Sequence, residues 1–132
     1  MAIVTGSARG LGAATAKRLA EEGAKVIVTD ILPDLAEATA ASLRDAGLAA
    51  HCIIADVTNP ADVQTLVEQT IATFGGLHIL VNNAGFPRDG FLTKMSEEDW
   101  DLVLKVILKG SFLTCKAVMP HFIEQQWGRI VN

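Results

Sequence analysis

A glycine-rich segment and the acid that follows it have the most recognisable chemistry in this sequence. Residues 5–12 read TGSARGLG, and Gly6, Gly10 and Gly12 have the spacing of a turn that brings the backbone close to a phosphate. An apolar run precedes this segment and a helical pattern follows it, so backbone N–H groups and the helix dipole would attract an anion. Asp30, 18 residues after Gly12, can accept hydrogen bonds from both hydroxyls of a ribose. The pattern predicts a dinucleotide site.

Two of these residues allow a second interpretation. Asp30 is also placed to cap a helix that begins near Pro33. Arg9 is either a solvated loop charge or a guanidinium that reaches a 2′-phosphate. Because Asp30 would repel such a phosphate, the sequence favours NAD(H) as the cofactor, with NADP(H) as the alternative.

Two further polar segments follow apolar runs. Asp56 and Val57 come after one run, and residues 82–85 (NNAG) come after the next. In a parallel sheet, ligands bind at the carboxyl ends of the strands, where both segments would lie. Asp56, or the backbone beside it, would contact the adenine amino group. The equally weighted alternative is that Asp56 forms a turn with residues 58–60 that caps the next helix.

The elements that position these residues alternate along the chain. Apolar runs predict strands, and apolar residues at helical spacing predict helices between them. The predicted strands cover residues 2–5, 25–30, 51–55, 78–82 and 128–131, and the predicted helices cover residues 11–22, 33–46, 60–74 and 96 to about 119. This alternation predicts an α/β, doubly wound (Rossmann) fold with a mostly parallel sheet in the order 3-2-1-4-5. We expect one dinucleotide-binding domain over residues 1–132, incomplete at its C-terminus because the fifth strand has only begun.

The composition narrows the function further. The chain has 11 Lys and Arg against 15 Asp and Glu, a net charge of −4, which argues against nucleic-acid binding. No apolar run approaches the roughly 20 residues of a membrane-spanning helix. Two cysteines form no disulfide framework, so we expect a reduced, cytoplasmic protein. The absence of tyrosine excludes any mechanism in which this chain supplies a phenol.

Taken together, the motifs resemble those of the short-chain dehydrogenase/reductase family. The resemblance is carried by TGSARGLG at residues 5–12, Asp56 with Val57, NNAG at residues 82–85 and GRIVN at residues 128–132. The segment around Arg88, Asp89, Leu92, Lys94, Met95 and Trp100 further resembles the 3-oxoacyl-acyl-carrier-protein reductase branch. The resemblance implies an NAD(P)-dependent oxidoreductase of carbonyls and alcohols that forms a dimer or tetramer.

The resemblance also assigns roles to residues. It implies that the segment at residues 6–12 lines the cofactor phosphates, that Asp30 binds the ribose, and that the two later segments line the adenine side. The complete set of expected cofactor-binding residues is Gly6, Ser7, Ala8, Arg9, Gly10, Leu11, Gly12, Asp30, Asp56, Val57, Asn83, Ala84 and Gly85. No metal site is expected, since His51, His78 and His121 have no metal-ligand spacing.

Two departures from the family pattern affect catalysis. The family's Ser and Tyr-x-x-x-Lys follow the fifth strand, and this sequence stops before them. The family's catalytic Asn corresponds to Ile107, which cannot hold the water of a proton relay. We therefore expect a cofactor-binding part without normal turnover. The alternative is a non-catalytic dinucleotide-binding or dimerising module.

The predicted helix at residues 96–119 is apolar around an unusually wide arc. Trp100, Leu104, Ile107, Leu108, Ser111 and Cys115 share one side, and Val103, Val106, Leu113 and Ala117 share another. We expect one side to cover the sheet and the other to contact a neighbouring helix or a second subunit. A homo-oligomer formed through this helix is the predicted assembly, and packing against another part of a longer protein is the alternative.

Overall fold

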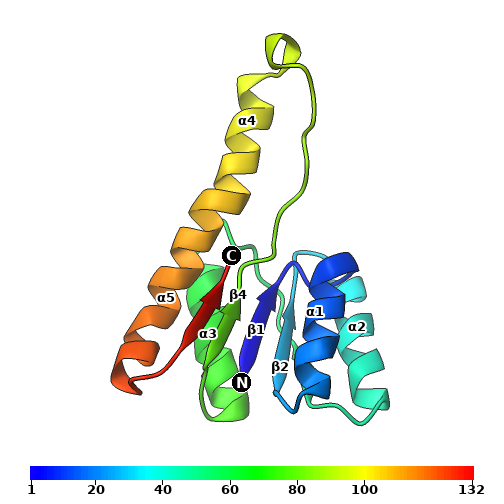
Figure 1. Ribbon diagram of the computed structural model, residues 1–132, viewed down its shortest axis with the longest axis vertical. Coiled ribbons are helices and arrows are strands. Elements are labelled where there is room, and N and C mark those ends of the chain that lie inside the picture. Colours follow the sequence, from blue (N-terminus) through cyan, green and yellow to red (C-terminus); the bar gives the residue numbers. More distant parts are fainter.

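Five parallel strands form the centre of the computed structural model, which describes all of residues 1–132 (Figure 1). The strands are β1 (Ala2–Thr5), β2 (Val26–Thr29), β3 (Ala50–Cys52), β4 (Ile79–Val81) and β5 (Arg129–Val131). Their order in the sheet is β3-β2-β1-β4-β5, and every neighbouring pair is parallel. The predicted doubly wound fold and strand order are confirmed.

Helices cover both faces of the sheet (Figure 1). Helices α1 (Gly10–Glu21) and α2 (Pro33–Asp45) lie on one face, and α3 (Pro60–Phe74) and α5 (Gly110–Glu124) lie on the other. Ala2 and Val4 of β1 pack beneath α1 and α2, whereas Ile3 between them packs beneath α3 and α5. Side chains of a strand alternate between faces, so a strand covered on both faces is apolar throughout.

Local signals set most helix starts as the sequence predicts. Pro33 and Pro60 occupy the first turns of α2 and α3, where a missing N–H costs nothing. The side chain of Asn59 caps α3 by accepting from the N–H of Ala61. Ser96 caps α4 (Glu97–Leu104), whose first turn carries three acids that favour the helix dipole.

The helix predicted to end near Met119 is longer and is interrupted. A π-helical turn, η2 (Lys105–Lys109), joins α4 to α5, and the N–H of Gly110 bonds to the carbonyl of Lys105. Helix α5 then continues through Pro120 to Glu124. Proline removes a helical hydrogen bond, but Val118 and Phe122 on either side of it are buried in the core, and their packing offsets that loss.

The buried side of this long helix also differs from the prediction. The residues that face the sheet are Gly110, Thr114, Val118 and Phe122, and none of them is on either of the two predicted apolar sides. Cys115 and Ala117 pack at the margin of the core. Counting apolar residues missed this face because it begins with a glycine and a threonine, which make close approach possible without being hydrophobic. Neither α4 nor η2 has a buried residue.

The remaining differences are small. Strand β3 ends at Cys52 rather than at Ala55, although the N–H groups of Ile53 and Ala55 still bond to the carbonyls of Val28 and Asp30. The segment between β4 and α4 is a loop, as predicted, with one 3-10 turn, η1 (Leu92–Lys94). No helix combines the length and the apolar character needed to cross a membrane.

Candidate functional site: a cavity at the carboxyl ends of the strands

The glycine-rich segment forms the turn from β1 into α1, and two of its glycines have no room for a side chain. A Cβ on Gly6 would lie 2.8 Å from the Cα of Ala84, and Gly6 also has a left-handed φ of 62°. A Cβ on Gly12 would lie 2.5 Å from Nδ2 of Asn83 and still closer to the carbonyl oxygen of Gly6. The segment therefore packs directly against the NNAG segment that follows β4.

Helix α1 begins without a capping side chain. Its N-cap residue, Arg9, is extended and its side chain makes no capping hydrogen bond, and the first turn carries no acid. Asn59 and Ser96 cap α3 and α4, whereas α2, like α1, has no capping side chain. The first N–H groups of a helix need partners. At α1 no side chain provides such a partner, and an anion is the ligand that the helix dipole would favour there.

Side chains bind the glycine-rich segment to β2. Ser7 is fully buried; its hydroxyl donates to the carbonyl of Val4 at 2.6 Å and accepts from the N–H of Thr29 at 3.0 Å. The Asp30 carboxylate accepts from the N–H of Ala8 at 3.1 Å. The sequence identified Ser7 and Ala8 as cofactor contacts, but in the structure their side chains are buried and support the turn.

Asp30 does not cap α2. Its Oδ1 accepts from the N–H groups of Ile31 and Leu32, at 2.8 and 3.3 Å, and Leu32 is the N-cap residue of α2 with no capping side chain. The capping alternative is therefore wrong, and the carboxylate instead shapes the turn after β2. Its Oδ2 accepts one backbone hydrogen bond, from Ala8, so acceptor capacity remains at the edge of the cavity described below.

A second set of hydrogen bonds joins β1 to the NNAG segment. The hydroxyl oxygen of Thr5 accepts from the backbone N–H groups of Asn83 and Ala84, each at 3.0 Å. The Asn83 side-chain amide donates back to the carbonyls of Thr5 and Gly6. Asn83 thus supports the turn and does not line the cavity. Sequence reasoning missed the hydroxyl of Thr5, for which the only signal was its position before the first glycine.

Asp56 forms the turn that was its alternative interpretation. Its Oδ1 accepts from the N–H of Thr58 at 2.8 Å, and its own N–H donates to Asp62 of α3 at 3.0 Å. The cap itself is Asn59. Asp56 and Val57 nevertheless line the same cavity as Asp30.

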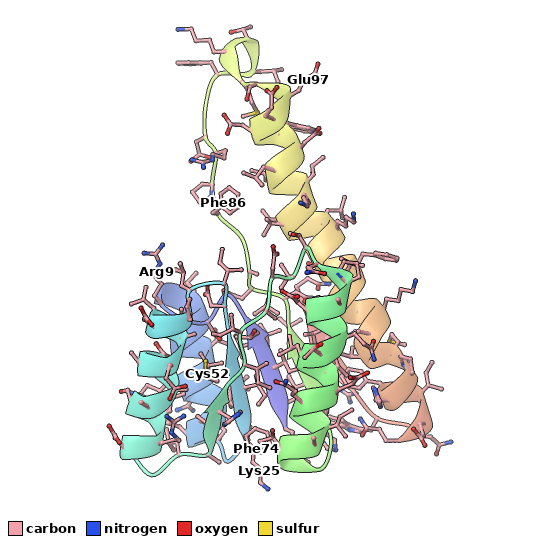
Figure 2. The ribbon with its side chains drawn as sticks, turned by 180° about the vertical axis from the view of Figure 1, so that it is seen from behind. Arg9, Lys25, Cys52, Phe74, Phe86 and Glu97 are labelled. Carbon is pink, nitrogen blue, oxygen red and sulfur yellow. The ribbon has the colours of Figure 1, made fainter.

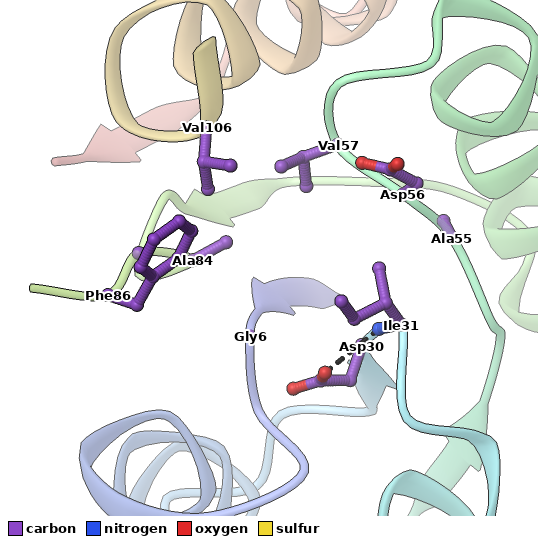
Figure 3. Close-up of a pocket in the computed structure, with 10 residues that line it drawn as sticks. Gly6, Asp30, Ile31, Ala55, Asp56, Val57, Ala84, Phe86 and Val106 are labelled. Atoms are coloured by element: carbon purple, nitrogen blue, oxygen red, sulfur yellow. Dashed lines mark hydrogen bonds between the residues drawn. The ribbon is translucent and has the colours of Figure 1, made fainter. Parts of the chain in front are cut away.

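A cavity of about 130 Å³, open to solvent, lies where the carboxyl ends of β1, β2 and β4 meet (Figure 3). It is lined by Gly6, Asp30, Ile31, Ala55, Asp56, Val57, Ala84, Gly85, Phe86 and Val106. Six predicted residues come together here. Ile31, Ala55 and Phe86 were missed although they adjoin predicted residues. Val106 was missed because its position depends on how the long helix crosses the sheet.

The rest of the glycine-rich segment lies outside this lining. Arg9 and Leu11 are exposed at the start of α1, and Leu11 is 81% exposed. Figure 2 shows the Arg9 side chain extending outward into solvent. Gly10 is also exposed, and a Cβ there would meet nothing within 4 Å.

Ile107 lies beside the NNAG segment. A Cβ on Gly85 would lie 3.2 Å from Cγ1 of Ile107, so the isoleucine packs against this glycine. The backbone carbonyl of Ile107 accepts from the hydroxyl of Ser111 at 2.6 Å. The side chain brings hydrocarbon and no polar group to this position.

The residues present fit an adenine dinucleotide. Ile31, Val57, Val106 and Phe86 give the cavity apolar walls suited to a flat base, and Asp30 provides a carboxylate for ribose hydroxyls. The uncapped start of α1 provides N–H groups for phosphates. No cation lines the cavity.

Comparison with known proteins agrees with this geometry. The family described as "short chain dehydrogenase" matches residues 1–132. The chain is 47% identical over 132 residues to BbsD of Thauera aromatica, a hydroxy(phenyl)methylsuccinyl-CoA dehydrogenase subunit. This match covers 100% of the chain and 53% of BbsD. It is 38% identical over 130 residues to a 3-oxoacyl-acyl-carrier-protein reductase of Thermotoga maritima, covering 98% of this chain and 53% of the reductase.

A solved structure gives the same result. The fold matches a gluconate 5-dehydrogenase from Burkholderia cenocepacia, crystallised with NADP and tartrate, with a TM-score of 0.91 and 37% identity. The match covers 98% of this chain and 51% of the dehydrogenase. The chain spans about half the length of the curated relatives it matches, and these relatives include 3-oxoacyl reductases alongside dehydrogenases of other substrates. The chain belongs to the short-chain dehydrogenase family and corresponds to its N-terminal half.

Proposed function

We propose that residues 1–132 form the dinucleotide-binding domain of an NAD(P)-dependent oxidoreductase that interconverts a carbonyl and an alcohol. The observation that supports this most directly is the meeting of Asp30, an uncapped helix N-terminus and an apolar cavity at one edge of the sheet. The bound nicotinamide would supply or accept the hydride. The residues of this chain would bind the cofactor and orient it.

The lining of the cavity supports NAD(H) as the preferred cofactor. Asp30 and Asp56 are both lining residues, and Arg9, the one cation of the glycine-rich segment, lies outside the lining. A 2′-phosphate placed beside Asp30 would be repelled by a like charge. The NADP bound in the gluconate 5-dehydrogenase structure describes the cofactor of that protein.

Fluorescence titration with NADH and NADPH tests this proposal. We expect the chain to bind NADH at least about tenfold more tightly than NADPH, which is a difference of about 1.4 kcal/mol. Asp30→Asn keeps an acceptor oxygen for the Ala8 N–H but removes the charge, and it should narrow the difference to about twofold. Asp34→Asn removes an acid of α2 outside the cavity and should leave the difference between NADH and NADPH affinity unchanged. Tighter binding of NADPH by the unmodified chain would contradict the preference, and no binding of either would contradict the proposed function.

We also propose that the 132-residue polypeptide binds cofactor without normal turnover. Reduction of a carbonyl requires a proton donor for the developing alkoxide. The chain has no tyrosine, and Ile107 places only hydrocarbon where the family has a polar side chain. The assay is NADH oxidation with a 3-oxoacyl thioester. Ordinary turnover by the 132-residue chain would overturn this part of the proposal.

Exposed apolar side chains on the long helix support self-association as a second property. Leu108 is 66% exposed and Phe112 is 59% exposed, and both lie beside Leu104 in one shallow groove. Exposed apolar surface of this kind marks interaction sites. A stable dimer that binds NADH without turnover would fit the alternative function, a dinucleotide-binding or dimerising module.

Because Cys52 and Cys115 are both free, we also propose a cytoplasmic, reducing location.

Sedimentation velocity tests the association. We expect Leu108→Lys to shift the chain toward monomer while NADH affinity is unchanged. Leu35→Lys, which alters an exposed leucine of α2 on the opposite face of the sheet, is the matched control and should keep the oligomer. A monomeric unmodified chain would contradict self-association.

A further inference from the structure

The backbone on both sides of Ala8, inside the glycine-rich segment, is held by side chains from other elements. Its N–H donates to Oδ2 of Asp30 at 3.1 Å. Its carbonyl oxygen accepts from the hydroxyl of Thr39 at 2.7 Å. Thr39 belongs to α2, 31 positions further along the chain, and does not line the cavity.

The position of this hydrogen bond matters for the direction of the next N–H groups. The carbonyl of Ala8 and the N–H of Arg9 belong to one rigid peptide plane. After it the chain enters α1 through an extended Arg9, with φ of −158° and ψ of 176°, and through Gly10 in a left-handed conformation with φ of 61°. No side chain caps α1, so nothing in the helix itself orients the plane between Ala8 and Arg9. Thr39 provides that restraint.

The buried packing of α2 against the sheet does not depend on Thr39. Four of its 13 residues are alanine, and Ala36, Ala40 and Leu43 supply its buried contacts with the sheet. A β-branched threonine is a poorer helix former than alanine. Thr39 is half-buried and its one side-chain hydrogen bond is the bond to Ala8.

We propose that Thr39 is a positioning residue for phosphate recognition. By holding the Ala8 carbonyl, it fixes the peptide plane at the entry to α1 and so aims the N–H groups that receive the cofactor phosphates. The proposal rests on the proposed function, because the phosphates are those of the dinucleotide. It assigns to α2 a part in phosphate binding although α2 places no side chain against the phosphates.

Ligands with and without phosphate separate this role from a general effect on stability. We compare Thr39→Val, which keeps the branched shape but cannot donate, with Thr39→Ser, which retains the hydroxyl. Ser42→Ala removes a hydroxyl from an exposed position of the same helix as the control. Each variant of the full chain is titrated with NADH, ADP and adenosine. We expect Thr39→Val to weaken NADH and ADP by about five- to tenfold, the effect of one lost hydrogen bond, and to leave adenosine within about twofold. Thr39→Ser and Ser42→Ala should bind all three as the unmodified chain does.

Amide hydrogen exchange of the unliganded chain gives a second readout. Thr39→Val should speed exchange at residues 8–11, and Thr39→Ser should restore the original rates. Unchanged ADP affinity in Thr39→Val, an equal loss for adenosine, or unchanged exchange at residues 8–11 would each overturn the role of Thr39. Failure of the unmodified chain to bind NADH or ADP would instead overturn the proposed function, and the phosphate role with it, while the exchange rates would still report on the contact.

Discussion

The glycine-rich turn and the segment at residues 86–109, here called the arm, are built in opposite ways. Around the turn, Thr5 and Ser7 are almost fully buried and their hydroxyls bond to neighbouring backbone. The arm comprises the loop after the cavity, α4 and η2, and it has no buried residue. Figure 1 shows it extending away from the sheet. The turn is held by long-range contacts, and the arm is held chiefly by local ones.

The two regions therefore differ in how firmly their side chains are packed. Beneath the cavity lie β1 and β2, whose side chains are 0–1% exposed, so its shape resists small changes of conditions. In the arm, Phe91 and Leu92 at the tip are 79% and 82% exposed. Regions with few buried contacts open locally at low free-energy cost. Changes in the turn should therefore affect stability and cofactor binding together. Changes in the arm should affect neither strongly, except at Phe86 and Val106, which line the cavity.

A glycine in each region gives the largest expected contrast. Gly12→Ala places a Cβ 2.5 Å from Nδ2 of Asn83 and against the Gly6 backbone, neither of which can move without disturbing β1. We expect a loss of about 3 kcal/mol or more in the free energy of unfolding, and loss of NADH binding. Gly90→Ala in the arm meets nothing within 4 Å and should change stability by less than about 0.5 kcal/mol. Urea unfolding followed by circular dichroism measures both; equal losses would contradict the contrast.

The sequence predicted the turn well because its signals are local. Glycine positions, an acid after an apolar run and strand–helix alternation identified the β1–α1 turn, Asp30 and the strand order. The supporting hydroxyls of Thr5 and Thr39 were missed. Each makes a bond between segments far apart in the chain, and a threonine at such a position has no distinctive pattern.

The long helix was predicted less well for a related reason. Its buried face begins with Gly110 and Thr114, and close packing there depends on small size. A Cβ on Gly110 would lie 2.9 Å from Cγ2 of Val57, a contact that no helical pattern encodes. The π-helical turn before it shifts the register between α4 and α5, so side chains placed on one face by an unbroken helical spacing diverge.

The alkylation rate of Cys52 measures how well the packed side of the sheet excludes a reagent. The pKa of the Cys52 thiol is raised to about 11. Burial is the largest cause, and the Glu37 carboxylate adds to it through its charge and a hydrogen bond. Figure 2 shows Cys52 beneath α2. With that pKa only about a thousandth of the thiol is ionised at pH 8, so iodoacetamide should react about 100-fold more slowly than with an ordinary thiol. The rate should rise as the pH approaches 11, and peptide mass spectrometry distinguishes Cys52 from Cys115.

Glu37→Gln sharpens this measurement. It removes the carboxylate's charge, so the pKa of Cys52 should fall part of the way and alkylation at pH 8 should be faster, while burial keeps it slower than a free thiol. Glu68→Gln, on α3 at the other face of the sheet, is the control and should react as the unmodified chain does. Alkylation of Cys52 at the rate of a free thiol in the unmodified chain would show that this side of the sheet opens as readily as the arm.

The smallest expected effect concerns the ion pair within the arm. Arg88 lies 3.4 Å from Asp99 and over the ring of Phe86, and both charged side chains are about half exposed. Water and salt screen such contacts, so Arg88→Ala should lower the free energy of unfolding by less than about 1 kcal/mol, and by less still in 1 M salt. Ser7→Ala in the turn leaves the buried Thr29 N–H without its side-chain acceptor and should cost about 2 kcal/mol at either salt concentration. Urea unfolding at about 0.1 and about 1 M NaCl, where the Debye length is about 10 Å and about 3 Å respectively, compares the two variants. A salt-independent loss in Arg88→Ala as large as that in Ser7→Ala would mean that the arm is held by the same kind of contact as the turn.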